Sequence, residues 1–220
     1  MNSEVWDYLY LYFMALEESY SKISSLYANP ASTSSNEGAQ ALENSSAMKN
    51  TDLFPIYQEI EKNILECQQN IKSMVSEKEL KYLICALIFH CDETVLTKKI
   101  ADHSIPVKNF EWPSLQRKMI NCRDGGERFF NYLDKLLQHS RDYKMAIEVY
   151  FFCLKRGFLG CYFNHPEQIQ NYLNRCSEVI KRNATLLNLN YGSTTLAEYK
   201  FLRDALRNKK NKGADNGAAT

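Results

Sequence analysis

The stretch that decides the fold is SEKELKYLICALIFHCDETV, residues 76–95. It opens with Ser76 and Glu79, the pattern of a capping box, in which the two residues satisfy each other's backbone N–H groups at a helix start. Apolar residues then recur every three or four positions: Leu80, Leu83, Ile84, Leu87, Ile88, Cys91 and Val95. This spacing predicts a helix, and Ala86 and Phe89 add apolar surface on its other side. We therefore expect this helix to lie at the centre of a bundle.

We also predict helices on both sides of this segment, most of them from the same kind of spacing. They cover about residues 3–27 and 52–71, a short piece ending near 121, and about 124–137, 143–156, 166–187 and 195–212. We expect Gly157 to end the helix before it in a left-handed conformation, which turns Phe158 back towards the bundle. Because no strand pattern and no internal repeat competes, the prediction is an all-α bundle of about seven or eight helices.

Composition divides the chain into regions. Residues 31–50 are mostly Ser, Ala, Asn, Thr, Gly and Glu, with almost nothing to bury, so we predict a mobile insertion there. A second capping box at Thr195 and Glu198 opens a helix that becomes basic from Arg203 to Lys212. We divide the chain into a helical domain over 1–187, a C-terminal helix with a basic end over 188–212, and a linker over 213–220.

The overall composition excludes several classes of function. Lys and Arg number 27 against 26 Asp and Glu, a net charge of +1, which lacks the concentrated positive potential of a nucleic-acid-binding protein. The seven cysteines are odd in number and contain no C-x-x-C, which fits free core thiols in a reducing cytosol. No run of about 18 apolar residues occurs, so we expect none of these residues to span a bilayer.

The densest group of ionisable side chains is His90, Asp92 and Glu93. Neighbouring residues on a helix point about 100° apart, so His90 and Cys91 cannot hold one metal ion, and the two carboxylates do not converge on one acid–base site. We therefore predict no catalytic, cofactor or metal site. Two interpretations of Asp92 and Glu93 stay open: an acidic patch that binds a partner, or structural carboxylates bonded to backbone or to a basic side chain.

A series of motifs runs from about residue 80 to 180. Asp92 and Glu93 follow Ala86 on one helix, and later come G-E-R-F-F-x-x-L at 126–133 and E-x-Y-x-x-C-L-x-x-G-F-x-G-x-Y at 148–162. The structural residues of these motifs are Trp112, Gly126, Glu127, Phe130, Glu148, Gly157, Phe158, Gly160 and Tyr162. In this order they resemble the DotU/TssL (IcmH) family of bacterial secretion-system proteins. Two features depart from that family: Cys161 replaces a basic residue, and the 31–50 insertion is long.

The resemblance implies a cytoplasmic domain of two packed helical subbundles, anchored in the bacterial inner membrane by a single C-terminal transmembrane helix beyond these residues. It implies a non-catalytic scaffold, without a cofactor, that binds an IcmF/TssM-type protein and baseplate-type components in a type IVB or type VI secretion system. The Lys- and Asn-rich composition leans towards type IVB. The basic stretch 203–212 suits the cytoplasmic flank of a membrane helix, although an ordinary solvated tail has the same composition. The alternative functions are a helical adaptor of another bacterial envelope complex and a small helical enzyme.

Overall fold

The computed structural model describes residues 3–28, 53–101 and 112–186. The predicted insertion at 31–50, C-terminal helix at 188–212 and linker at 213–220 lie outside these residues. Residues 1–180 form one compact unit, and the fold described below is that of this unit. Lys181–Thr220 form a second unit, of which residues 181–186 are described.

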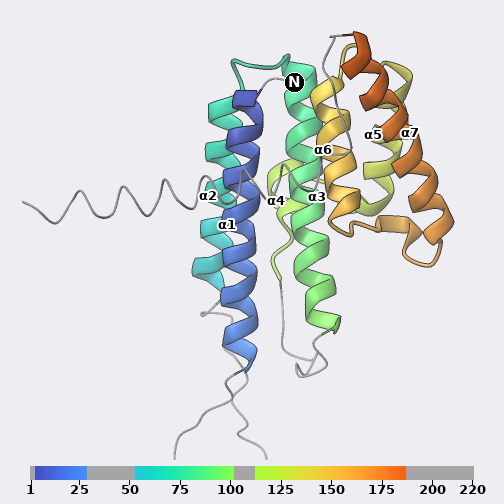
Figure 1. Cartoon of the computed structure of the whole chain (residues 1–220). Coiled ribbons are helices and arrows are strands. Elements are labelled where there is room, and N and C mark those ends of the chain that lie inside the picture. Colours follow the sequence, from blue (N-terminus) through green and yellow to red (C-terminus); the bar gives the residue numbers. More distant parts are fainter. Residues whose placement is uncertain (1–2, 29–52, 102–111, 187–220) are drawn as a thin grey trace, which may run out of the picture. The chain divides into compact units, whose positions relative to one another are not determined.

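The described part of the chain is built from seven α-helices and one short 3-10 helix (Figure 1). They are α1 (Ser3–Ala28), α2 (Phe54–Ile71), α3 (Glu77–Ala101), α4 (Leu115–Ile120), α5 (Gly125–Gln138), α6 (Lys144–Lys155), η2 (Gly160–Tyr162) and α7 (Pro166–Leu186). Apart from the short α4, each described α-helix follows the apolar spacing that predicted it. The prediction of an all-α bundle is confirmed.

The helix predicted to be central, α3, contacts α2, α4, α5 and α6. All ten residues from Leu83 to Asp92 are buried, so this part of α3 has no solvent-facing side. The pair α1 and α2 packs together, with α2 also against α3, while α5 and α6 contact α3 from the other side (Figure 1). The hydroxyl of Tyr172 on α7 donates to Asp134 on α5, 2.8 Å away, which joins α7 to this second group.

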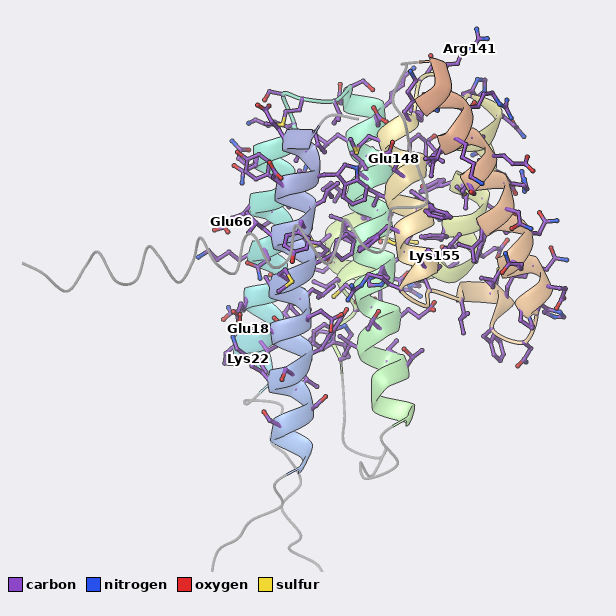
Figure 2. The ribbon with its side chains drawn as sticks, in the orientation of Figure 1. Glu18, Lys22, Glu66, Arg141, Glu148 and Lys155 are labelled. Atoms are coloured by element: carbon purple, nitrogen blue, oxygen red, sulfur yellow. The ribbon has the colours of Figure 1, made fainter. Side chains whose placement is uncertain are left out.

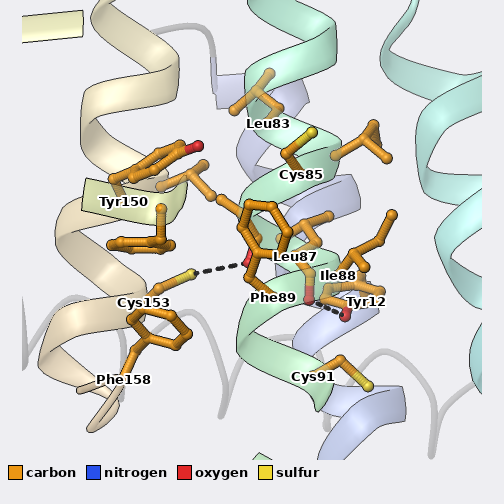
Figure 3. Close-up of a cluster of buried hydrophobic side chains, with 14 of the residues drawn as sticks. Tyr12, Leu83, Cys85, Leu87, Ile88, Phe89, Cys91, Tyr150, Cys153 and Phe158 are labelled. Atoms are coloured by element: carbon orange, nitrogen blue, oxygen red, sulfur yellow. Dashed lines mark hydrogen bonds between the residues drawn. The ribbon is translucent and has the colours of Figure 1, made fainter. Parts of the chain in front are cut away.

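The core between α1, α3 and α6 contains polar atoms that bond to the α3 backbone (Figure 3). The Tyr12 hydroxyl donates to the carbonyl of Leu87 at 3.2 Å, and the Cys153 thiol faces the carbonyl of Ala86 at 4.0 Å. All seven cysteines are free thiols, and all except Cys161 are buried. The interpretation of core thiols is thus confirmed for six of them, which pack as small apolar side chains.

Candidate functional site

Asp92 occupies a buried position on α3, where the residue is only 2% exposed. It accepts four hydrogen bonds, from the indole N–H of Trp112 (2.9 Å), the hydroxyl of Ser114 (2.9 Å) and the backbone N–H groups of Leu115 (3.0 Å) and Gln116 (2.9 Å). Leu115 and Gln116 are the first residues of α4, and the first N–H groups of a helix lack partners within it. Asp92 therefore caps α4 from another helix.

Glu93 serves a different segment, the loop that follows α6. Its carboxylate accepts the backbone N–H groups of Leu159 at 2.6 Å and of Gly160 at 2.8 Å. Burial raises the pKa of Glu93, and the two backbone hydrogen bonds oppose this shift. Glu93 therefore fixes the start of η2 to the central helix.

Glu79, near the start of α3, bonds to the first turn of α6. Its carboxylate accepts the backbone N–H of Ala146 at 3.1 Å, and burial raises its pKa. Its own backbone N–H donates to the hydroxyl of Ser76 at 3.2 Å, so half of the predicted capping box is present. The other half of the prediction, in which the Glu79 carboxylate accepts the backbone N–H of Ser76, is wrong. Glu79 is only 8% exposed, and its carboxylate turns to the buried N–H groups of α6 instead.

The three carboxylates thus hold the starts of three segments, α6, α4 and η2, against one helix. The sequence left two interpretations open for Asp92 and Glu93. These contacts match the structural one, in which the carboxylates bond mainly to backbone N–H groups. As predicted, the two carboxylates point to different segments and share no site. Their partner-binding role stays a prediction, for which only half-buried Glu93 offers accessible surface.

Gly157 ends α6 in the predicted left-handed conformation, with φ of +95°. Its N–H donates to the carbonyl of Leu154, and the N–H of Phe158 to the carbonyl of Cys153, both at 3.0 Å. These two bonds form a Schellman motif. Phe158 is buried, with its ring centroid 4.1 Å from that of Phe129, so this prediction is confirmed.

Two further motif glycines allow the η2 loop to touch the start of α5. A Cβ on Gly160 would lie 2.6 Å from the carbonyl oxygen of Gly126, and one on Gly126 would lie 3.1 Å from the Cα of Gly160. The rings of Phe130 and Tyr162 pack beside this contact with centroids 4.6 Å apart. The two motifs, which are separated by 14 residues in the sequence (134–147), therefore form one junction.

The remaining motif residues have separate positions. Glu148 of α6 accepts the indole N–H of Trp6 on α1 at 2.8 Å, and burial raises its pKa. Glu127 is exposed in the first turn of α5, where a carboxylate favours the helix dipole. Sequence reasoning missed the partners of Asp92, Glu79 and Glu148, since these pairs are 20 to 142 residues apart and no local pattern marks them.

His90 has a packing role beside these carboxylates. It is 1% exposed, and its ring meets that of Phe13 edge-on at 5.7 Å. Within the described residues, no group of three or more His, Cys, Asp or Glu side chains is arranged to hold a metal ion. In that same part of the chain, no helix has the length and apolar content needed to cross a membrane.

Two comparisons with known proteins found a match. The family model described as "Type VI secretion system protein DotU" matches residues 36–205, which include every motif residue named above. The solved structure of DotU from Francisella novicida matches with a TM-score of 0.54 and 18% sequence identity, over 76% of this chain and 96% of that one. At this identity the second likeness concerns the fold alone. A search of curated proteins found no match.

Proposed function

The chain belongs to the DotU family, and is therefore a component of a bacterial secretion system; from this premise we propose that it acts there as a non-catalytic scaffold at the cytoplasmic face of the inner membrane. The observation that carries the proposal is the family match over residues 36–205. The scaffold is proposed to bind an IcmF/TssM-type inner-membrane protein and baseplate-type components, with a C-terminal transmembrane helix as its anchor.

The use of the ionisable groups supports a role without catalysis. An acid–base catalyst needs a titratable group that a substrate can reach. The carboxylate of Asp92 is buried under four donors, and those of Glu79 and Glu93 each accept backbone N–H groups. These groups position helices, which suits a rigid body that holds other proteins.

If Glu93 also contributes to partner binding, the η2 loop lies within that interface. Leu159 and Gly160 are bonded to its carboxylate, and Phe163, directly after η2, is 67% exposed. An exposed aromatic side chain beside a fixed loop is a typical contact residue of protein interfaces. This loop is therefore the first surface to probe for the role predicted for Asp92 and Glu93.

We propose a type VI machine, because the matching family model carries that description. Type IVB, towards which the composition leans, is the alternative. The identity of the secretion genes beside this one distinguishes the two.

The experiment is a clean deletion of the gene in its own bacterium, complemented with a tagged chain. We expect deletion to abolish secretion and to lower the amount of the IcmF/TssM-type protein in the inner membrane. We also expect the tagged chain to co-isolate with that protein after mild crosslinking. Normal secretion and normal partner levels in the deletion strain would refute the proposal.

A further inference from the structure

One face of α1 differs from an ordinary solvated helix face. The exposed residues of its described side chains recur at intervals of three and four: Glu4, Asp7, Leu11, Met14, Glu18, Ser21 and Ser25. Leu11 is 55% and Met14 43% exposed. Half-buried Tyr8, Tyr10 and Ala15 flank them at helical spacing. We name these five residues, Tyr8, Tyr10, Leu11, Met14 and Ala15, the α1 patch.

The α1 patch points away from the core of its own unit. The opposite side of α1 is the buried one, with Val5, Leu9 and Leu16 at 2% exposure or less. On one flank, α2 contacts α1 through Glu59, which binds Lys22 at 2.9 Å. On the other flank, α6 contacts α1 through Trp6 and Glu148. Leu11 and Met14 remain exposed between these flanks.

Acidic residues stand at both ends of the α1 patch. Glu4 and Asp7 precede it, and Glu17 and Glu18 follow it. Together, α1 and α2 carry seven acidic side chains and two basic ones. Lys22 is shared between Glu18 and Glu59, and Glu66 projects from α2 on the side away from α3 (Figure 2). Arg156, at the end of α6, forms an ion pair with Glu17, and acidic side chains still outnumber basic ones around the α1 patch.

We propose that the α1 patch is a docking surface for a basic amphipathic helix of a partner protein. Apolar residues at i, i+3 and i+4 match the anchors of a helix laid along them, and Lys or Arg on that helix would meet the acidic ends. A membrane surface fits poorly, because anionic headgroups repel this rim. A symmetric dimer through the α1 patch would bring acidic residues against acidic residues. The inference rests on the proposed function, that the chain works by binding other proteins.

The test uses the complete chain and a designed probe, a fluorescent helical peptide of Leu and Lys about 18 residues long. We expect saturable binding that weakens as salt rises, and binding about tenfold weaker or worse for a matched Leu and Glu peptide. Replacing Leu11 and Met14 by Ser should weaken binding about tenfold. The variant Asp7→Asn with Glu18→Gln should weaken it about threefold and reduce the salt dependence.

The matched control is Leu65→Ser on α2, which removes an apolar side chain of similar exposure, 50%. It should bind like the unaltered chain, and circular dichroism should show all variants folded. The inference would be overturned if the Lys peptide did not bind, or if both peptides bound equally. It would also be overturned if the variant Leu11→Ser with Met14→Ser bound the Lys peptide fully, or if the unaltered chain self-associated and this variant did not. Co-isolation of the unaltered chain with the IcmF/TssM-type protein distinguishes this inference from the proposed function. If the two proteins co-isolate but the peptide test fails, only the α1 patch is rejected as a docking surface.

Discussion

The indole N–H of Trp112 donates a 2.9 Å hydrogen bond to the carboxylate of Asp92, 20 residues earlier in the chain. The ring of Trp112 also meets that of Tyr57 on α2 edge-on, with centroids 5.3 Å apart. Asp92 thus joins the central helix to α4, and Trp112 extends the connection to α2. Two residues that the sequence singled out for separate reasons form one structural unit.

Asp92→Asn is expected to lower the free energy of unfolding by about 3 kcal/mol, because an amide supplies one acceptor oxygen where four donors converge and places its own N–H groups against them. Urea unfolding followed by tryptophan fluorescence measures this. Trp112→Phe, which removes a single donor and keeps an aromatic ring, should cost less. If Asp92→Asn unfolded like the unaltered chain, the capping role would be refuted.

Glu93→Gln is expected to act locally on the η2 loop. An amide oxygen accepts more weakly than a carboxylate, so we expect faster hydrogen exchange at the amides of Leu159 and Gly160, with a global loss of about 1 kcal/mol. Glu127→Gln removes the charge of an exposed carboxylate in the first turn of α5, the helix that the η2 loop contacts, and serves as the control. Unchanged exchange at both amides would show that Glu93 does not fix the loop.

Glu148 provides a prediction on pH. Burial raises its pKa in the folded protein, against a smaller lowering by the Trp6 hydrogen bond. The pKa of Glu148 is higher in the folded state than in the unfolded state. The contribution of Glu148 to stability is therefore complete below about pH 4.3, and it is lost as pH rises through the folded-state pKa. Glu148→Gln keeps an acceptor for Trp6 and does not ionise. Its stability relative to the unaltered chain should therefore increase from pH 4 towards 7; a difference that stays constant with pH would contradict this.

The features that the sequence predicted correctly are those that depend on residues close together along the chain. The helices follow from apolar spacing, and the end of α6 follows from Gly157, since both are determined within a few residues. The capping box failed in its second half, because the choice of Glu79 between Ser76 and α6 depends on which N–H groups the bundle buries. The contacts of Asp92 with α4 and of Glu93 with η2 depend on the same tertiary arrangement. Helical periodicity indicated which way these side chains point, and only the fold brought their partners there.

Substitutions at Gly157 and Gly160 distinguish two costs of adding a side chain. At Gly157 the cost is backbone strain alone, and at Gly160 it is strain together with lack of space. A Cβ on Gly157 would meet no atom within 4 Å, so Gly157→Ala should cost only the strain of positive φ, about 1 kcal/mol. Gly157→Asn should cost less, since Asn tolerates the left-handed region. At Gly160, with φ of +52°, a Cβ would also lie 2.6 Å from the carbonyl oxygen of Gly126, and backbone cannot move aside as a flexible side chain can.

We therefore expect Gly160→Ala to cost about 2 kcal/mol or more, and Gly160→Asn to recover little of it, because steric overlap adds to strain. The four variants are compared by urea unfolding under one condition. The diagnostic result is the pattern: Asn rescues position 157 relative to Ala but does not rescue position 160. Rescue by Asn at both positions would mean that α5 and the loop can separate at small cost. The close contact between Gly126 and Gly160 would then not be what holds the two motifs together.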